Sequence, residues 1–331
     1  MTYIIRSGFA GGIAGCVAKT SVAPLDRVRI LFQTSNPQFT KYTKSWVGFA
    51  QALRDIYGRD GMKGIFRGHS ATLLKIYPYA AINFVAHEQY RALIICSKSQ
   101  ETWIRRFSAG ASAGVTSVFL LYPLDIIRVR LAFETKSRTS SLVEICRRIY
   151  HEQLLSNSAP VVSGSTSGVI KDVALAATPR TGVINFYRGF SMTILGMVPY
   201  AGMSFMTHDV VGDLLRQPSV QKYTILAQPA NAPSDKPAPL RAWAELTSGG
   251  VSGAVSQTVS YPLEVIRRRM QVGGAVGDGH RLGIGETAGV IFKERGISGF
   301  FVGLYIGYVK VVPMVAISFY TYERMKSFLG I

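Results

Sequence analysis

Three short stretches of the chain place an acidic and a basic residue at the same spacing after a proline. They read APLDRVRILFQ from Ala23, YPLDIIRVRLA from Tyr122 and YPLEVIRRRMQ from Tyr261, and each fits the pattern Pro-x-acid-x-x-base. A carboxylate and a guanidinium can form a charge-assisted hydrogen bond, within one helix or between two. One copy would indicate only a kinked helix with solvated charges, but three copies in register favour a shared function for these charges.

Two further landmarks recur with this motif, so the chain consists of three repeats. One reads DGMKGIFRG, TGVINFYRG and RGISGFFVG, and the other reads KIYPYAAINF, GMVPYAGMSF and KVVPMVAISF. The interval of 10 residues between them is constant, from Gly68 to Pro78, from Gly189 to Pro199 and from Gly303 to Pro313. We expect repeat one at 1–97, repeat two at 103–216 with a flexible insertion at 154–180, a polar linker at 217–240 and repeat three at 241–331.

The composition favours a membrane protein. The chain of 331 residues is 48% hydrophobic and only 17% charged, with a mean hydropathy of +0.20. No segment offers about twenty uninterrupted apolar residues, so a hydropathy scan is expected to score most spans as marginal. Helices that line a polar cavity have this character, because intramembrane charges face the interior of the bundle. A soluble helical protein with a large core stays open on composition alone. The first residues, MTYIIRSGFAGGIAG, show no cleavable signal pattern, so a secretory route is not expected.

Each repeat is predicted to contain a span, a loop with a short amphipathic helix and a second span. Small residues that permit close helix packing in lipid mark the first span of every repeat. They are Gly8, Gly11, Gly12 and Gly15, then Gly110 and Gly114, then Gly249 and Gly253. The loop segment 45–58 has apolar residues at helical spacing, typical of a helix on the membrane surface. We therefore predict an all-α membrane protein with six transmembrane helices in three tandem two-helix repeats with pseudo-threefold symmetry.

The excess of positive charge indicates an anionic partner. Lysine and arginine number 37 against 19 acidic residues, a formal net charge of +18. Nucleic acid is not favoured, because no basic cluster with stacking aromatics and no known binding module is present. The three cysteines, Cys16, Cys96 and Cys146, and the scattered histidines have no metal-site spacing, so we expect neither a metal nor a cofactor. No nucleophile–base pattern indicates an enzyme.

The charged motifs are expected to meet on one axis. Three equal pairs of spans close most naturally into a barrel with threefold symmetry, in which equivalent residues lie at one level. The acids would then alternate with the bases in a ring of ion pairs, Asp26, Asp125 and Glu264 with Arg29, Arg128 and Arg267. Pairing makes such charges tolerable in a low-dielectric bundle, and a ring that must break before a path opens is a gate. The prolines would kink these helices so that their ends converge.

Together these motifs resemble those of the mitochondrial carrier family, solute carrier family 25, over essentially the whole chain. The resemblance implies a multi-pass transporter of the inner mitochondrial membrane, in which the ion-pair ring is the matrix-side gate and the short helices lie on the matrix surface. In this family a glutamine after the motif braces the gate. Gln33 and Gln271 occupy that position, whereas Ala132 does not, so we expect an intact gate that is lightly braced.

The resemblance also predicts a second gate, on the cytosolic side, built from an aromatic-acid-x-x-base motif. Here the motif reads HEQYR from His87, HDVVG from His208 and YERMK from Tyr322. The gate residues would be Glu88, Arg91, Asp209, Glu323 and Lys326. Because Gly212 replaces the base of the second copy, at most two of the three ion pairs can form. We expect the cytosolic gate to be the weaker one.

Residues that break the threefold symmetry are expected to bind a solute that lacks it. Three residues before the proline of each second span stand Lys75, Gly196 and Lys310, and Lys19 adds another cation. We expect these three lysines to be unpaired and to meet phosphate groups as point charges. Met197 and Tyr200 complete an apolar corner in which the missing side chain of Gly196 leaves room for a planar ring. The alternative is that the lysines reach to lipid headgroups and that the corner only packs.

The resemblance narrows the substrate class. In the family, a glycine followed by an aliphatic residue or methionine at this position accompanies nucleotide-type substrates, and Gly196-Met197 fits. The segments APLDRVRILFQT and GHSATLLKIYPYAA resemble the coenzyme A carrier subgroup, fungal type. The implied substrate is coenzyme A or a closely related adenine nucleotide, moved by alternating access. Membrane lipid, including anionic lipid such as cardiolipin, is the other expected partner, and one chain supplies all three repeats of a functional monomer.

Two alternatives remain. An ADP/ATP or ATP–phosphate carrier is the nearer one, although the RRRMMM motif of ADP/ATP exchangers is only partly matched by RRRMQV at 267–272. A carrier-like membrane scaffold that transports nothing is the other, and it predicts degenerate gates and a neutral cavity. The complete set of ring residues and the basic cavity residues count against the scaffold.

Overall fold

The computed structural model describes residues 2–43, 45–95, 102–135, 141–152, 182–226, 238–273 and 283–330. Within these ranges the regular structure is helical, apart from one isolated bridge between Ile225 and Leu240. The all-α prediction is confirmed for the described part of the chain. The predicted insertion at 154–180 and residues 227–237 of the predicted linker lie outside the described residues.

Each repeat contributes a long first helix, a short surface helix and a second long helix. The first helices are α1 (Thr2–Gln33), α4 (Trp103–Phe133) and α9 (Ala242–Val272). The surface helices are α2 (Trp46–Ile65), α5 (Leu142–His151) and α10 (Ile284–Arg295). The second helices are α3 (His69–Ile94), α7 (Phe190–Leu215) and, in repeat three, α11 (Leu304–Val309) followed by α12 (Val311–Leu329). Shorter pieces are η1 (Thr40–Tyr42), η3 (Ile184–Tyr187), α8 (Gln221–Thr224) and η4 (Gly296–Phe301).

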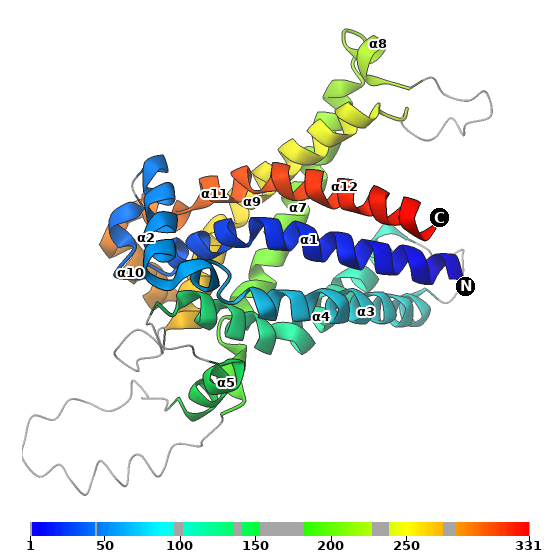
Figure 1. The fold of residues 1–331 in the computed structure, drawn as a ribbon. Coiled ribbons are helices and arrows are strands. Elements are labelled where there is room, and N and C mark those ends of the chain that lie inside the picture. Colours follow the sequence, from blue (N-terminus) through cyan, green and yellow to red (C-terminus); the bar gives the residue numbers. More distant parts are fainter. Residues whose placement is uncertain are drawn as a thin grey trace, which may run out of the picture.

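The long helices follow one another in a closed order. Helix α3 packs along α4, α7 along α9 and α12 along α1, so that the second helix of each repeat lies beside the first helix of the next (Figure 1). The first helices α1, α4 and α9 also contact one another. This cyclic arrangement brings equivalent residues of the three repeats together.

Apolar packing makes the first helices converge beyond their prolines. Val28, Leu31 and Phe32 of α1 pack with Ile56 of α2, and equivalent clusters join α4 to α5 and α9 to α10. A further cluster, of Ile30, Val129, Ala132 and Val272, lies where the three first helices meet. Burial of these side chains stabilises the converging ends.

A glycine begins the second helix of each repeat, in a left-handed conformation that other residues rarely adopt. The φ angles are 83° at Gly68, 75° at Gly189 and 80° at Gly303. A Cβ at Gly68 would lie 2.8 Å from the carbonyl oxygen of Arg128 in α4, and one at Gly189 would lie 3.3 Å from that of Arg267 in α9. The glycines therefore let each second helix start against the motif of the next repeat.

Two stretches among the described residues, Arg105–Phe133 and Ile284–Leu329, are long and apolar enough to cross a membrane by length and composition. The other long helices do not pass the same test. The stretch in α4 passes although it contains the motif charges Asp125 and Arg128, which face the other first helices rather than the outside of the bundle.

Candidate functional site

Six charged side chains at the converging ends of the first helices form three ion pairs. Asp26 pairs with Arg128 at 2.9 Å, Asp125 with Arg267 at 3.2 Å and Glu264 with Arg29 at 2.8 Å. Every pair joins the acid of one repeat to the base of the next, so the three pairs tie α1, α4 and α9 into one ring. We refer to the α1–α4, α4–α9 and α9–α1 sectors of this ring, in the order just given.

The ring is largely shielded from solvent. The exposed fractions of the six side chains run from 8% for Arg29 to 26% for Glu264. Removing one partner from a buried ion pair typically costs about 3–5 kcal/mol, because the other charge is left uncompensated. The closed ring therefore holds the three helix ends together firmly.

Two of the three sectors are braced by a glutamine and a tyrosine. Gln33 Nε2 donates to Tyr261 Oη at 3.0 Å in the α9–α1 sector, and Gln271 Nε2 donates to Tyr122 Oη at 3.1 Å in the α4–α9 sector. The guanidinium of Arg29 lies 5.3 Å from the ring centroid of Tyr261, within the range of a cation–π contact. Sequence reasoning placed the glutamines but missed the tyrosines, although a tyrosine precedes the proline in two of the three motifs.

The α1–α4 sector has no such brace. Ala23 stands where the other motifs have tyrosine, and Ala132 stands where they have glutamine. A small cavity of about 10 Å³ lies here, lined by both alanines together with Arg67, Gly68 and His69, and it has room for about one water molecule. The ring is thus complete but unequal, because the α1–α4 sector lacks the glutamine–tyrosine brace of the other two.

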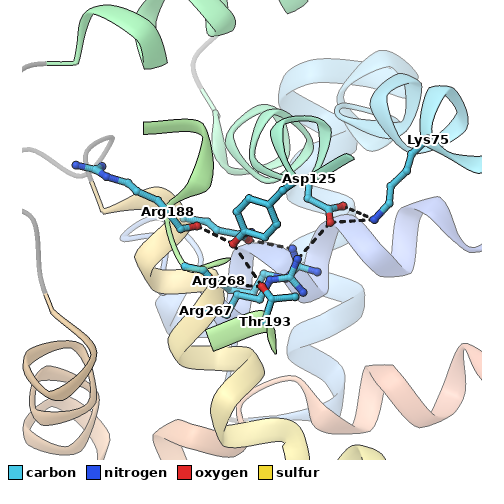
Figure 2. Close-up of polar contacts among 9 residues, drawn as sticks. Lys75, Asp125, Arg188, Thr193, Arg267 and Arg268 are labelled. Carbon is cyan, nitrogen blue, oxygen red and sulfur yellow. Dashed lines mark hydrogen bonds and ion pairs between the residues drawn. The ribbon is translucent and has the colours of Figure 1, made fainter. Parts of the chain in front are cut away.

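Lys75 and Lys310 belong to the ring as well. Lys75 Nζ donates to both oxygens of Asp125 at 2.9 Å, and Lys310 Nζ donates to Asp26 Oδ1 at 2.8 Å. Figure 2 shows Lys75 of α3 and Arg267 of α9 reaching the Asp125 carboxylate together. The expectation that these lysines are unpaired is wrong, because their long side chains reach down to the acids of the neighbouring first helix.

The third carboxylate has no lysine. Gly196 takes the equivalent position in α7, and a Cβ there would lie 3.8 Å from Leu263 of α9. Met197 packs against the apolar cluster of α4, and Tyr200 is 46% exposed. The second repeat therefore presents an apolar corner where the other two present an ammonium group.

Lys19 differs from the other two lysines. Its Nζ lies 3.5 Å from Met314 Sδ of α12, and no carboxylate among the described residues lies within 4.0 Å of it. Of the three predicted cavity lysines, Lys19 is the one without an ion pair in the part of the chain described here.

Two acids of the predicted second gate, Asp209 and Glu323, have partners in their own helix, and His208 of the second motif also lies 3.4 Å from Glu245 of α9. Lys326 lies 3.9 Å from Glu323 one turn away, and Asp209 lies 3.9 Å from the neighbouring His208. Glu88 and Arg91 are exposed. The barrel is thus closed by ion pairs between helices at the end where α1, α4 and α9 converge.

A buried network that sequence reasoning did not find supports the second repeat. Glu152 pairs with Arg130 at 3.0 Å and with Arg188 at 3.3 Å, and Arg130 Nε donates to the carbonyl of Gln271 at 2.7 Å. Asn185 Nδ2 donates to the carbonyls of Ile149 and Glu152. Repeat three contains the equivalent pair, Arg269 with Glu294 at 2.6 Å, so the spacing of the repeats could have pointed to Glu152.

Comparisons with known proteins agree with this architecture. The sequence profile of the family described as "Mitochondrial carrier protein" matches residues 2–98, 99–219 and 238–331. The chain is 49% identical to "Mitochondrial carrier protein LEU5" of Saccharomyces cerevisiae, over 99% of this chain and 91% of that protein. It is 38% identical to human "Solute carrier family 25 member 16", over 98% and 89%. It is 35% identical to "Mitochondrial coenzyme A transporter SLC25A42" of Xenopus laevis, over 97% and 84%.

Proposed function

Because this chain belongs to the mitochondrial carrier family, we propose that it carries coenzyme A, or a closely related adenine nucleotide, across the inner mitochondrial membrane by alternating access. As a member of that family it is a multi-pass transporter of this membrane and not an enzyme. A relative named as a coenzyme A transporter aligns over nearly the whole chain, which supports the substrate class.

The observation that carries the proposal is the sharing of the gate carboxylates. Asp125 is held by both Lys75 and Arg267, and Asp26 by both Lys310 and Arg128, whereas Glu264 has Arg29. Each arginine already neutralises one acid of the ring. Lys75, Lys310 and Lys19 therefore add positive charge beyond what the ring acids need for neutralisation.

Phosphate groups of the substrate would compete for the surplus lysines. A phosphate group carries about −1.5 to −2 charge and three strong acceptor oxygens, whereas an arginine already neutralises each ring carboxylate. When Lys75 and Lys310 turn to phosphates, Asp125 and Asp26 each lose one cationic partner, and a hydrogen bond to a charged group contributes about 1.5–3 kcal/mol. Substrate binding would thus weaken the matrix gate in the two sectors that carry a lysine, which couples binding to opening.

The apolar corner would receive the planar part of the substrate. Gly196 leaves space that a longer side chain would fill, and Tyr200 is available as an aromatic surface beside Met197. An adenine ring in this corner would place its phosphates toward the two lysines of the other repeats. Adenine nucleotides with several phosphates fit this division of the site.

The test is uptake of labelled coenzyme A into proteoliposomes that contain the purified protein, with ATP, ADP and adenosine 3′,5′-bisphosphate as competitors. We expect saturable uptake that adenosine 3′,5′-bisphosphate inhibits. Uptake of ADP or ATP with no uptake of coenzyme A would overturn the proposal that coenzyme A is the substrate, but the proposed nucleotide-binding site would stand. Absence of uptake of all of these by folded protein would favour the non-transporting scaffold.

A further inference from the structure

Tyr79 lies at the same level of the barrel as Tyr200. Both residues directly follow the proline of a second helix, and Met314 is their counterpart in repeat three. Tyr79 is four residues after Lys75, so the two side chains share one face of α3. The level just above the lysines therefore carries two tyrosines and one methionine.

The contacts of neighbouring residues show that both tyrosines face the interior. In an α-helix, residue i+4 points about 40° from residue i, between i and i+1. In α7, Gly196 faces Leu263 of α9, and Met197 approaches Gly114 of α4, with its Cε 3.5 Å from where a Cβ would be. Tyr200 therefore points between α9 and α4, into the interior of the barrel.

The same reasoning places Tyr79. Lys75 reaches Asp125 of α4, and Ile76 Cγ2 lies 3.8 Å from where a Cβ of Gly15 in α1 would be. Tyr79 points between these two directions, so it faces the interior between α4 and α1.

Tyr79 also joins the lysine to the apolar corner. The ring of Tyr79 packs against the apolar cluster of α4, the same cluster against which Met197 of α7 packs. Lys75 Nζ lies 5.3 Å from the Tyr79 ring centroid, within cation–π range. One continuous surface thus runs from the Lys75 ammonium across Tyr79 and α4 to the corner of Met197.

We propose that Tyr79 is a second aromatic wall of the base-binding site, so that the adenine ring of the substrate lies between Tyr79 and Tyr200 across the α4 surface. This inference rests on the proposed function and adds a specificity-determining residue to it. A phosphate on the ribose of the same nucleotide is then delivered to the Lys75 ammonium group, which already lies over the Tyr79 ring. Repeat three, with Met314 at the equivalent position, lacks this aromatic wall.

The experiment compares two competitors of coenzyme A uptake that differ in the base. Adenosine 3′,5′-bisphosphate contains adenine, and 4′-phosphopantetheine contains a phosphate but no base. The variants are Tyr79→Met, which copies repeat three, and Tyr79→Phe, which keeps the ring. Tyr320→Leu is the matched control, because Tyr320 is 63% exposed on α12.

In Tyr79→Met we expect the inhibition constant of adenosine 3′,5′-bisphosphate to rise about tenfold, as loss of one base-stacking partner does elsewhere. The constant of 4′-phosphopantetheine should stay within about twofold of wild type. Tyr79→Phe and Tyr320→Leu should leave both constants unchanged. The ratio of the two constants within one variant does not depend on how much of that variant is folded.

Equal weakening of both competitors in Tyr79→Met would overturn the inference, because Tyr79 would then act only by positioning Lys75. Unchanged constants for both would overturn it too. In either case, uptake of coenzyme A by the wild-type protein would leave the proposed function intact. If the wild-type protein transported no adenine compound, the proposed function would fail and this inference with it.

Discussion

Adding the missing brace to the α1–α4 sector is expected to slow the opening of the matrix gate. The change is the double substitution Ala23→Tyr and Ala132→Gln, which copies the pair found in the other two sectors. Both alanines line the cavity beside Arg67 and Gly68. In the braced sectors the tyrosine hydroxyl donates to the carbonyl of the residue before the helix-starting glycine, Arg188 or Val302. A tyrosine at position 23 would reach the carbonyl of Arg67 in the same way.

The braced sectors give the size of the effect. Their glutamine–tyrosine hydrogen bonds measure 3.0 and 3.1 Å, and their arginines lie 5.3 and 5.5 Å from the tyrosine ring centroids. A neutral hydrogen bond contributes about 1 kcal/mol net, and a cation–π contact contributes about 0.5–1 kcal/mol. If gate opening limits turnover and breaks both contacts, the rate should fall about ten- to thirtyfold.

The assay is the initial rate of coenzyme A uptake in proteoliposomes, combined with thermal unfolding of the wild type, both single variants and the double variant. Ala132→Gln alone should destabilise the protein, since it buries an amide without the tyrosine partner. The double variant should recover that loss, which a double-mutant cycle measures as a favourable coupling energy. A double variant that shows the coupling yet transports at the wild-type rate would refute the reasoning that this sector limits opening.

Three further outcomes follow from the contacts around the ring. Glu152→Gln should lower the free energy of unfolding by about 3–5 kcal/mol, because buried Arg130 and Arg188 lose their shared carboxylate. The control is Glu144→Gln, in an exposed pair, which should change the free energy of unfolding by less than about 1 kcal/mol. Thermal unfolding measures both. Gly303→Ala should lower the unfolding midpoint by a few degrees, because its φ of 80° is costly for alanine, and an equal effect of Gly249→Ala would contradict this cause. Tyr122→Phe should raise the uptake rate by loosening the α4–α9 sector, and a slower rate would contradict the role of the brace.

The repeats explain why so much of the fold was predictable. Constant intervals in three copies imply equivalent positions, and equivalent positions in a closed barrel meet at one level. The alternation of acids and bases in one ring followed from that symmetry, although the sequence did not specify which base pairs with which acid. The prediction of an all-helical fold was confirmed for the described residues, and the predicted family was confirmed by the family profile.

The contacts of Lys75 and Lys310 were not predictable in the same way. They depend on the register between a second helix and the next first helix, and on a side chain long enough to cross between them. Sequence spacing describes positions along one helix and contains no such register. The Tyr122 and Tyr261 braces lay within reach of sequence reasoning. So did Glu152, because its counterpart Glu294 pairs with Arg269, the residue equivalent to Arg130.

The most direct test of whether substrate phosphates draw Lys75 and Lys310 away from the gate is the uptake of labelled coenzyme A by two variants, Lys75→Ala and Lys310→Ala. The surface variant Lys293→Ala is the control. We expect both cavity variants to lose most saturable uptake while remaining folded, since Asp125 and Asp26 each keep an arginine. Lys293→Ala, at an exposed position of α10, should transport like the wild type. Wild-type uptake and affinity in both cavity variants would contradict the proposed coupling between the lysines and the gate.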